Sequence, residues 1–270
     1  MKVGKHTLHA VVQGEADQTV VFDSGLGSCS LDWSHIQSEL SKHAATVAYD
    51  RAGYGWSYKN RGSATSKEIV EDLRDLLKQL NLEPSYILVG HSFGGLNMRL
   101  FAQLYPKEVS GLILVDSTNE YQFLPEYIDE RWRREYTRYL KSYRLGYLFS
   151  IPGITRFINR PVWNRSLPLT FKPLGFRRNA YEALYKKYMS IIVSCRMVKD
   201  QGINKDIPIT VLTAGKMNES WKEGQQKLTK LSPNTRQIIA QDSYHNIHFE
   251  HPEIVVKAVM EILNFEARGD

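Results

Sequence analysis

Short apolar runs alternate along most of the chain with stretches that repeat at helical spacing. The runs occupy residues 19–23, 46–50, 86–90, 112–116, 209–213 and 237–240. Runs of this length without strict alternation are typical of strands buried on both faces. A hairpin is expected before the first of them, around residues 6–14.

Helical periodicity is clearest at residues 66–80, where Ile69, Leu73, Leu76 and Leu77 fall on one face. Further helices are expected at residues 93–105 and from about 252 to 265. Strands that alternate with helices predict an α/β fold with a doubly wound, mostly parallel sheet.

The alternation stops after Asp116 and resumes near Pro208. Helices are expected at residues 126–144 and 179–200, and four prolines between them exclude one continuous helix. This stretch also holds 16 of the 30 aromatic residues. We therefore predict a mostly helical cap at residues 119–205, inserted into a core formed by residues 1–118 and 206–270.

Charge sets the predicted cap apart from the rest of the chain. The net charge is +6, but residues 119–205 hold 17 Lys and Arg against 7 Asp and Glu, or +10, which leaves −4 elsewhere. An anionic substrate, contact with acidic lipid and simple solvation of helix faces explain this surplus equally well. Nucleic-acid binding has no other support, because no recognised motif accompanies the charge.

Cellular context is inferred from what the chain contains. No apolar run approaches the ~20 residues of a membrane span, and the first residues lack the apolar core of a signal peptide. The two cysteines, Cys29 and Cys195, have no metal-ligand or redox spacing. We expect a soluble cytoplasmic protein without stable membrane insertion, metal or organic cofactor.

The sequence Gly90-His91-Ser92-Phe93-Gly94 matches the pattern G-x-S-x-G between a predicted strand and a predicted helix. A nucleophile at such a turn needs a strained backbone, and the flanking glycines avoid clashes there. The free N–H groups of the following helix can hold a developing oxyanion. Ser92 is therefore the candidate nucleophile, against the alternative of an ordinary glycine-rich turn.

Two further elements of a serine hydrolase have candidates. The loop Ser24-Gly25-Leu26-Gly27 follows the first long strand and offers the N–H of Leu26 as an oxyanion donor beside that of Phe93, unless it is merely a flexible turn. The general base must follow the last strand, which favours His245. His248 is its closest rival, and His251 is expected to cap the last helix.

These segments resemble the α/β-hydrolase superfamily, in its single-serine, esterase-like branch. The resemblance also covers the turn from Tyr49 to Ser57 and the sequence Leu114-Val115-Asp116-Ser117. It spans most of residues 1–118 and 206–270, and the insertion matches the family's variable cap in position only. Two departures stand out: Ser24 where many relatives have His, and Asn218 at the usual site of the triad acid after the seventh strand.

The resemblance permits an acid after the sixth strand, and Asp116 ends that strand with its carboxylate at the expected edge. The order Ser…Asp…His is then preserved. Glu219 and an uncharged Asn218 remain alternatives, and Asp116 could simply cap its turn with Ser117.

The pattern as a whole predicts hydrolysis of a small or medium carboxylic ester through an acyl-enzyme. Relatives with an aspartate nucleophile, such as epoxide hydrolases and dehalogenases, are disfavoured because serine occupies this position. Peptidase, thioesterase, carbon–carbon hydrolase and hydroxynitrile lyase activities stay open, as do a non-catalytic ligand-binding role and the oligomeric state. Cap aromatics either line the substrate pocket or hold the cap together. They are Trp132, Tyr136, Tyr139, Tyr143 and Trp163.

Overall fold

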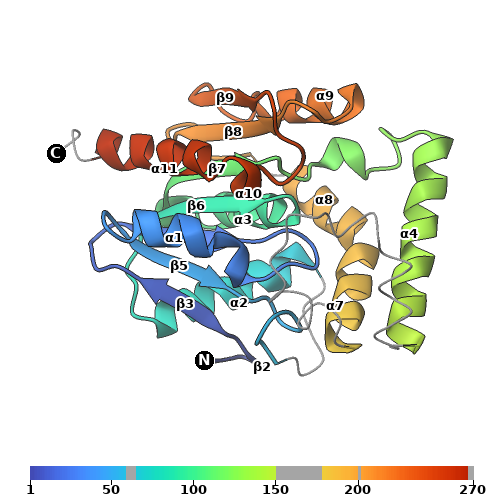
Figure 1. Cartoon of the computed structure of the whole chain (residues 1–270), viewed down its shortest axis with the longest axis horizontal. Helices are drawn as coiled ribbons and strands as arrows, with labels where there is room; N and C mark the ends of the chain where they lie inside the picture. Colours follow the sequence, from blue (N-terminus) through green and yellow to red (C-terminus); the bar gives the residue numbers. More distant parts are fainter. Residues whose placement is uncertain (59–64, 150–177, 200–201, 267–270) are drawn as a thin grey trace.

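A seven-stranded sheet forms the centre of the molecule in a computed structural model that describes residues 1–58, 65–149, 178–199 and 202–266 (Figure 1). The strand order is β3-β5-β4-β6-β7-β8-β9. Only β3, at one edge, runs antiparallel to its neighbour β5; every other pair is parallel. The strands are β3 (Ala10–Gln13), β4 (Thr19–Asp23), β5 (Ala45–Tyr49), β6 (Tyr86–His91), β7 (Val109–Val115), β8 (Ile209–Ala214) and β9 (Thr235–Ala240). The predicted doubly wound, mostly parallel sheet is confirmed.

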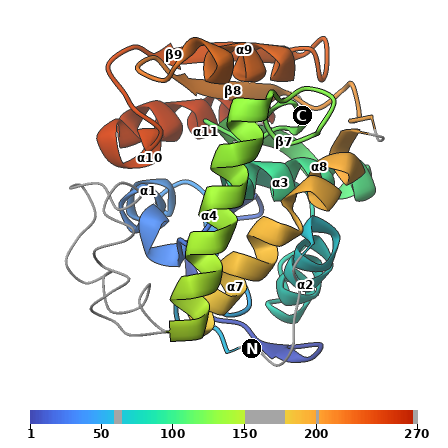
Figure 2. The same cartoon turned by 90° about the vertical axis from the view of Figure 1, so that its right-hand side faces the viewer.

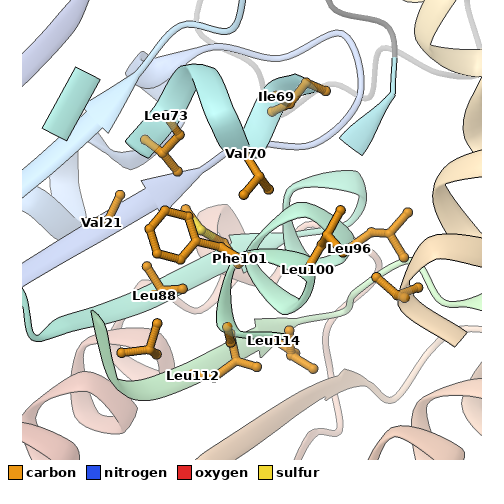
Figure 3. Close-up of a cluster of buried hydrophobic side chains, with 14 of the residues drawn as sticks. Val21, Ile69, Val70, Leu73, Leu88, Leu96, Leu100, Phe101, Leu112 and Leu114 are labelled. Atoms are coloured by element: carbon orange, nitrogen blue, oxygen red, sulfur yellow. The ribbon is translucent and has the colours of Figure 1, made fainter. Parts of the chain in front are cut away.

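Successive residues of the central strands enter different cores, one on each face of the sheet. In β4, Val20 and Phe22 join one hydrophobic cluster while Val21 joins the other. Leu88, Leu112 and Leu114 lie on the same face as Val21 (Figure 3). This period of two explains why the strands read as uninterrupted apolar runs, since both faces are buried.

Helices cover both faces of the sheet. On the face of Val20 lie α1 (Ser34–Leu40) and α11 (Pro252–Glu266), whereas α2 (Ser66–Gln79) and α3 (Phe93–Leu104) pack on the opposite face. The start of α2 is fixed by a capping box, in which Thr65 and Glu68 exchange hydrogen bonds. Shorter elements are η1 (Ser30–Trp33), η2 (Pro106–Glu108), α9 (Glu219–Leu228) and α10 (Ile247–Glu250).

The segment between β7 and β8 contains η3 (Glu120–Gln122), α4 (Glu130–Phe149), α7 (Arg178–Met189) and α8 (Ile191–Lys199). Figures 1 and 2 show α4 and α7 side by side at one end of the sheet, with α4 outermost. By contrast, α8 packs on α2 and α3, and its residues Ile191 and Cys195 belong to the main core. The last helix of the predicted cap is therefore anchored in the core.

Several boundaries differ from the sequence-based expectation. The helix expected at 126–144 begins at Glu130, after Pro125, and Asp129 Oδ1 accepts a hydrogen bond from the N–H of Trp132 (2.7 Å). The helix expected at 179–200 divides at Ser190 into α7 and α8.

The N-terminal hairpin also differs: it joins β1 (Lys2–Val3) to β2 (His6–Thr7), and β3 instead pairs with β5. The short apolar run of β3 fits a strand at the sheet edge as well as a strand of a hairpin, so the local sequence could not distinguish the two pairings. None of the helices in the described ranges is long and apolar enough to cross a membrane.

Candidate active site

Ser92 stands at the turn between β6 and α3 with a backbone that residues other than glycine rarely adopt, at φ 51° and ψ −119°. The glycines on either side make this turn possible. A Cβ on Gly90 would lie 2.6 Å from the backbone carbon of Gly94, and a Cβ on Gly94 would overlap the carbonyl of Asp23. The spacing G-x-S-x-G is thus a steric requirement of a loop that raises Ser92 above the sheet.

The loop after β4 passes directly beside Ser92. A Cβ at Gly25 would lie 3.5 Å from the Cβ of Ser92, and it would lie 2.9 Å from the ring of His91. Leu26 is the next residue of this loop. Phe93 is the first residue of α3, so its N–H has no acceptor in a preceding helical turn. The two predicted oxyanion donors therefore come from loops that meet at Ser92.

A buried arginine, Arg51, is hydrogen-bonded to the loop that follows β4. The guanidinium of Arg51 donates to the carboxylate of Asp23 and to the backbone carbonyls of Ser24 and Gly25. The other oxygen of Asp23 accepts from Asn97 Nδ2 of α3 (2.8 Å). Ser24 Oγ, where many relatives have His, donates to the carbonyl of Cys29 (2.7 Å) and closes the loop on itself.

Arg51 belongs to the turn from Tyr49 to Ser57, for which the sequence suggested a structural role without naming its contacts. Its planar fork suits two adjacent carbonyls and a carboxylate, an arrangement that a lysine cannot reproduce. Because Asp23, Arg51 and Asn97 are all nearly inaccessible to solvent, the loop rests on a desolvated network.

Asp116 follows β7, and its side chain is completely buried. Its backbone also takes a positive φ, 42°. One carboxylate oxygen accepts a hydrogen bond from the N–H of Ala214 (3.0 Å), and the other lies 2.6 Å from His245 Nδ1. The neighbouring strand β8 thereby fixes the carboxylate in the direction of the histidine.

His245 completes a continuous chain of hydrogen bonds, since its Nε2 lies 3.0 Å from Ser92 Oγ. A carboxylate can only accept, so Nδ1 carries the proton and Nε2 is free to accept from the serine hydroxyl. The histidine is partly exposed, unlike Asp116. The structure therefore brings together the three side chains that the sequence singled out from three separate loops.

Two further histidines, His91 and His248, lie near His245; the sequence considered His248 only as a rival base and gave His91 no role of its own. The ring of His91 lies 4.7 Å from that of His245 and 4.2 Å from that of His248, between ring centroids. His91 Nε2 is 2.9 Å from the backbone oxygen of His245, so it donates there and ties the serine loop to the histidine loop. Burial and the neighbouring histidines hold the pKa of His91 well below its usual range, which keeps the ring neutral.

His248 is 2 % exposed and lies 3.9 Å from the carboxylate of Asp32. Burial lowers the pKa of His248 to about 3 and raises the pKa of Asp32 to about 7. With its ring enclosed by Trp33 and His91, His248 does not reach Ser92. Position in the fold thus separates the two candidate bases, of which the sequence favoured His245.

The other residues that the sequence considered for this region make different contacts. The side chain of Glu219 is 83 % exposed and pairs with Lys222 at 2.5 Å. Asn218 caps α9 by accepting from the N–H of Trp221 (2.9 Å). The carbonyl of His251 accepts from the N–H of Ile254 at the start of α11 (3.1 Å), the capping position expected for it.

Most of the described cap aromatics pack against one another. Tyr136 stacks on Tyr188 of α7, and Tyr139 and Tyr143 approach the same ring edge-on. These contacts join α4 to α7, which corresponds to the structural alternative for these residues. Trp163 lies outside the described residues.

Trp132 differs, because it also lines a cavity of about 520 Å³ between α4 and α9. Trp221 lines the same cavity and meets the ring of His245 edge-on, with centroids 5.0 Å apart. Aromatic and polar side chains line this cavity, and one of them, Trp221, contacts His245. Its volume is that of a small-ligand site.

Helix α7 approaches the loop formed by residues 24–27. A Cβ at Gly27 would lie 3.7 Å from Leu184 Cδ1, and Leu184 joins a small cluster with Tyr54. The loop is therefore covered by α7, and α4 covers α7 in turn.

Comparison with known proteins agrees with this architecture. Residues 18–149 match the family model described as alpha/beta hydrolase fold. The chain is 24 % identical over 261 residues to the uncharacterized protein YqjL of Bacillus subtilis, a match that covers 95 % of this chain and 87 % of that protein.

Solved structures of similar shape include enzymes of two kinds. An epoxide hydrolase from Bacillus megaterium superimposes with a TM-score of 0.73 at 21 % identity, covering 95 % of this chain and 96 % of that one. A thermophilic esterase from Thermogutta terrifontis gives 0.68 at 21 % identity, with 95 % and 93 % covered. At this identity the likeness establishes the fold, and the reaction has to be argued from the site.

Proposed function

We propose that this chain, a member of the α/β-hydrolase superfamily, is a serine hydrolase that cleaves small or medium carboxylic esters through an acyl-enzyme. The observation that carries the proposal is the linkage of Ser92, His245 and Asp116 by hydrogen bonds of 3.0 and 2.6 Å. Epoxide hydrolysis is disfavoured, because serine stands where enzymes of that type use an aspartate nucleophile.

In the proposed mechanism Ser92 Oγ attacks the ester carbonyl while His245 Nε2 takes the hydroxyl proton. The negative charge that develops on the carbonyl oxygen is held by the N–H groups of Leu26 and Phe93. The carbon–oxygen bond to the alcohol then breaks, and His245 returns the proton to the leaving oxygen. Water, activated by the same histidine, hydrolyses the acyl-serine and restores the enzyme.

Asp116 has a supporting part in this mechanism. Its buried carboxylate holds His245 in the tautomer that leaves Nε2 free, and it stabilises the imidazolium formed during attack. Trp221 and Trp132, which line the cavity beside His245, are proposed to contact one side of the substrate.

The proposal is tested with p-nitrophenyl esters of increasing acyl length, using the wild-type chain and Ser92→Ala side by side. Hydrolysis is expected for the shorter members with the wild type and for none with the variant. A styrene oxide assay is run in parallel. Opening of the epoxide without ester cleavage, or ester cleavage that survives in Ser92→Ala, would overturn the proposal.

A further inference from the structure

The outer side of α4 carries cations and leucines on a single face. Arg134, Arg138, Lys141, Leu145 and Leu148 recur at spacings of three and four residues, which places them along one line of the helix. We call these five residues the α4 outer face. The opposite side of the helix, with Tyr136, Tyr139 and Tyr143, packs on α7.

The cations of the α4 outer face are not neutralised within the described part of the chain. The two acidic residues of α4 are engaged by other arginines: Glu130 lies 3.0 Å from Arg133, and Glu135 lies 3.9 Å from Arg131. Within the described ranges no carboxylate lies within ion-pair distance of Arg134, Arg138 or Lys141.

The sequence that follows α4 cannot supply the missing charge. Residues 150–177 contain five Lys and Arg and no Asp or Glu. Helix α4 itself carries six Lys and Arg against two Glu. The positive charge of α4 is therefore left to be balanced by anions from outside the chain.

The leucines indicate which kind of anion fits. Leu145 is 45 % exposed and Leu148 is 56 % exposed, next to Lys141 on the same face. A nucleic-acid backbone would satisfy the cations but leave both leucines in water, and the α4 outer face offers no aromatic ring on which a base could stack. An interface of acidic headgroups over acyl chains satisfies both.

We propose that the α4 outer face docks the protein on membrane surfaces that contain anionic lipid. Helix α4 carries six basic residues, three of them on this face, and basic clusters of this size on an amphipathic helix are typical of contact with anionic lipid. The apolar residues add a second, weaker attachment. Helix α7 lies between α4 and the loop formed by residues 24–27, so the α4 outer face is turned away from Ser92. Docking through this face would therefore keep Ser92 away from the lipid.

The test measures co-sedimentation of the full chain with vesicles of phosphatidylcholine alone and with added phosphatidylglycerol. We expect binding only to the second kind, weakening as salt rises because the contact is electrostatic. Replacing one cation should weaken binding roughly fivefold, and Arg134→Gln/Arg138→Gln/Lys141→Gln by about a hundredfold. Leu145→Ser/Leu148→Ser should also weaken binding while leaving its salt dependence in place.

A matched control carries the same change in net charge elsewhere. Lys78, Lys107 and Lys257 are exposed and lie outside the cap, so Lys78→Gln/Lys107→Gln/Lys257→Gln should bind nearly as well as the wild type. Ser92→Ala should bind like the wild type too, which keeps this test independent of the proposed hydrolysis.

Three results would overturn the proposal. They are equal binding to both kinds of vesicle, equal loss in the two triple variants, and retention on immobilised heparin without any vesicle binding. The last would assign the α4 outer face to a soluble polyanion. Circular dichroism of each variant confirms that α4 is still folded, because glutamine is a good helix former at these positions.

Discussion

The carboxylate of Asp116 lies 2.6 Å from Nδ1 of His245, although 129 residues separate the two in sequence. The contact depends on β8, because the N–H of Ala214 holds the second oxygen of the carboxylate. The candidate acid thus follows β7, the strand that the sequence analysis counted as the sixth. After the next strand, β8, Asn218 caps a helix instead.

Asp116→Asn is therefore expected to lower kcat by up to ~10⁴ with the fold intact, because the amide favours the wrong tautomer of His245. Glu219→Gln is the matched control and should change kcat little, since that side chain is exposed and bonded to Lys222. Steady-state kinetics of the two variants decide whether Asp116 or Glu219 is the acid. A large loss in Glu219→Gln with an active Asp116→Asn would move the acid to the other loop.

Arg51→Lys should reduce kcat roughly 10- to 100-fold with little change in KM, because the loop that carries Leu26 loses its bidentate support while the buried charge is kept. Arg74→Gln is a suitable control, since Arg74 also pairs bidentately with a carboxylate, that of Glu108, far from Ser92. Kinetics and thermal melting of both proteins are compared. Equal losses of kcat in the two variants would show that Arg51 acts on stability alone.

Asp32 gives the protein a specific dependence of stability on pH. Burial raises the pKa of Asp32 to about 7, against 3.8 as its ordinary value. The folded state therefore binds this proton more tightly than the unfolded state, and the stabilisation is complete below about pH 4 and lost as pH rises to 7.

Asp32→Asn should remove that decline and raise the free energy of unfolding above pH 7 by on the order of a few kcal/mol. Urea unfolding at a series of pH values measures it. A variant whose pH profile parallels the wild type would show that Asp32 is ionised in the folded protein, with the nearby His248 or Arg51 as its counter-charge.

Trp132→Ala is expected to shift preference toward longer or bulkier esters, because it enlarges the cavity beside Trp221. The control is Tyr139→Ala, which removes a ring from the contact between α4 and α7. It should lower the melting temperature without changing the order of substrates. The quantity compared is kcat/KM across the ester series, and an unchanged order in Trp132→Ala would exclude the cavity from the substrate site.

The parts of this molecule that are local in sequence could be predicted from it. The buried strands follow from runs such as 86–90, and the turn at Ser92 follows from the steric demand for Gly90 and Gly94. The doubly wound, mostly parallel sheet was predicted correctly on this basis.

Features that depend on distant contacts could not be predicted in the same way. Arg51 donates to the carbonyls of Ser24 and Gly25, which are distant from it in sequence. The ring of His91 likewise contacts His245 only because the fold brings their two loops together. Similarly, the local sequence of β3 does not specify that this strand pairs with β5 at the edge of the sheet. The roles assigned to the site residues remain predictions that rest on this geometry.

The most direct test of the central claim is labelling by a fluorophosphonate probe at neutral pH, followed by mass spectrometry of the labelled peptide. The account predicts covalent modification at Ser92, none in Ser92→Ala, and greatly slowed labelling in His245→Ala, because the hydroxyl loses its base. His248→Gln should be labelled nearly as fast as the wild type. Absence of labelling at Ser92 in the folded wild-type protein, or slow labelling in His248→Gln with rapid labelling in His245→Ala, would contradict it.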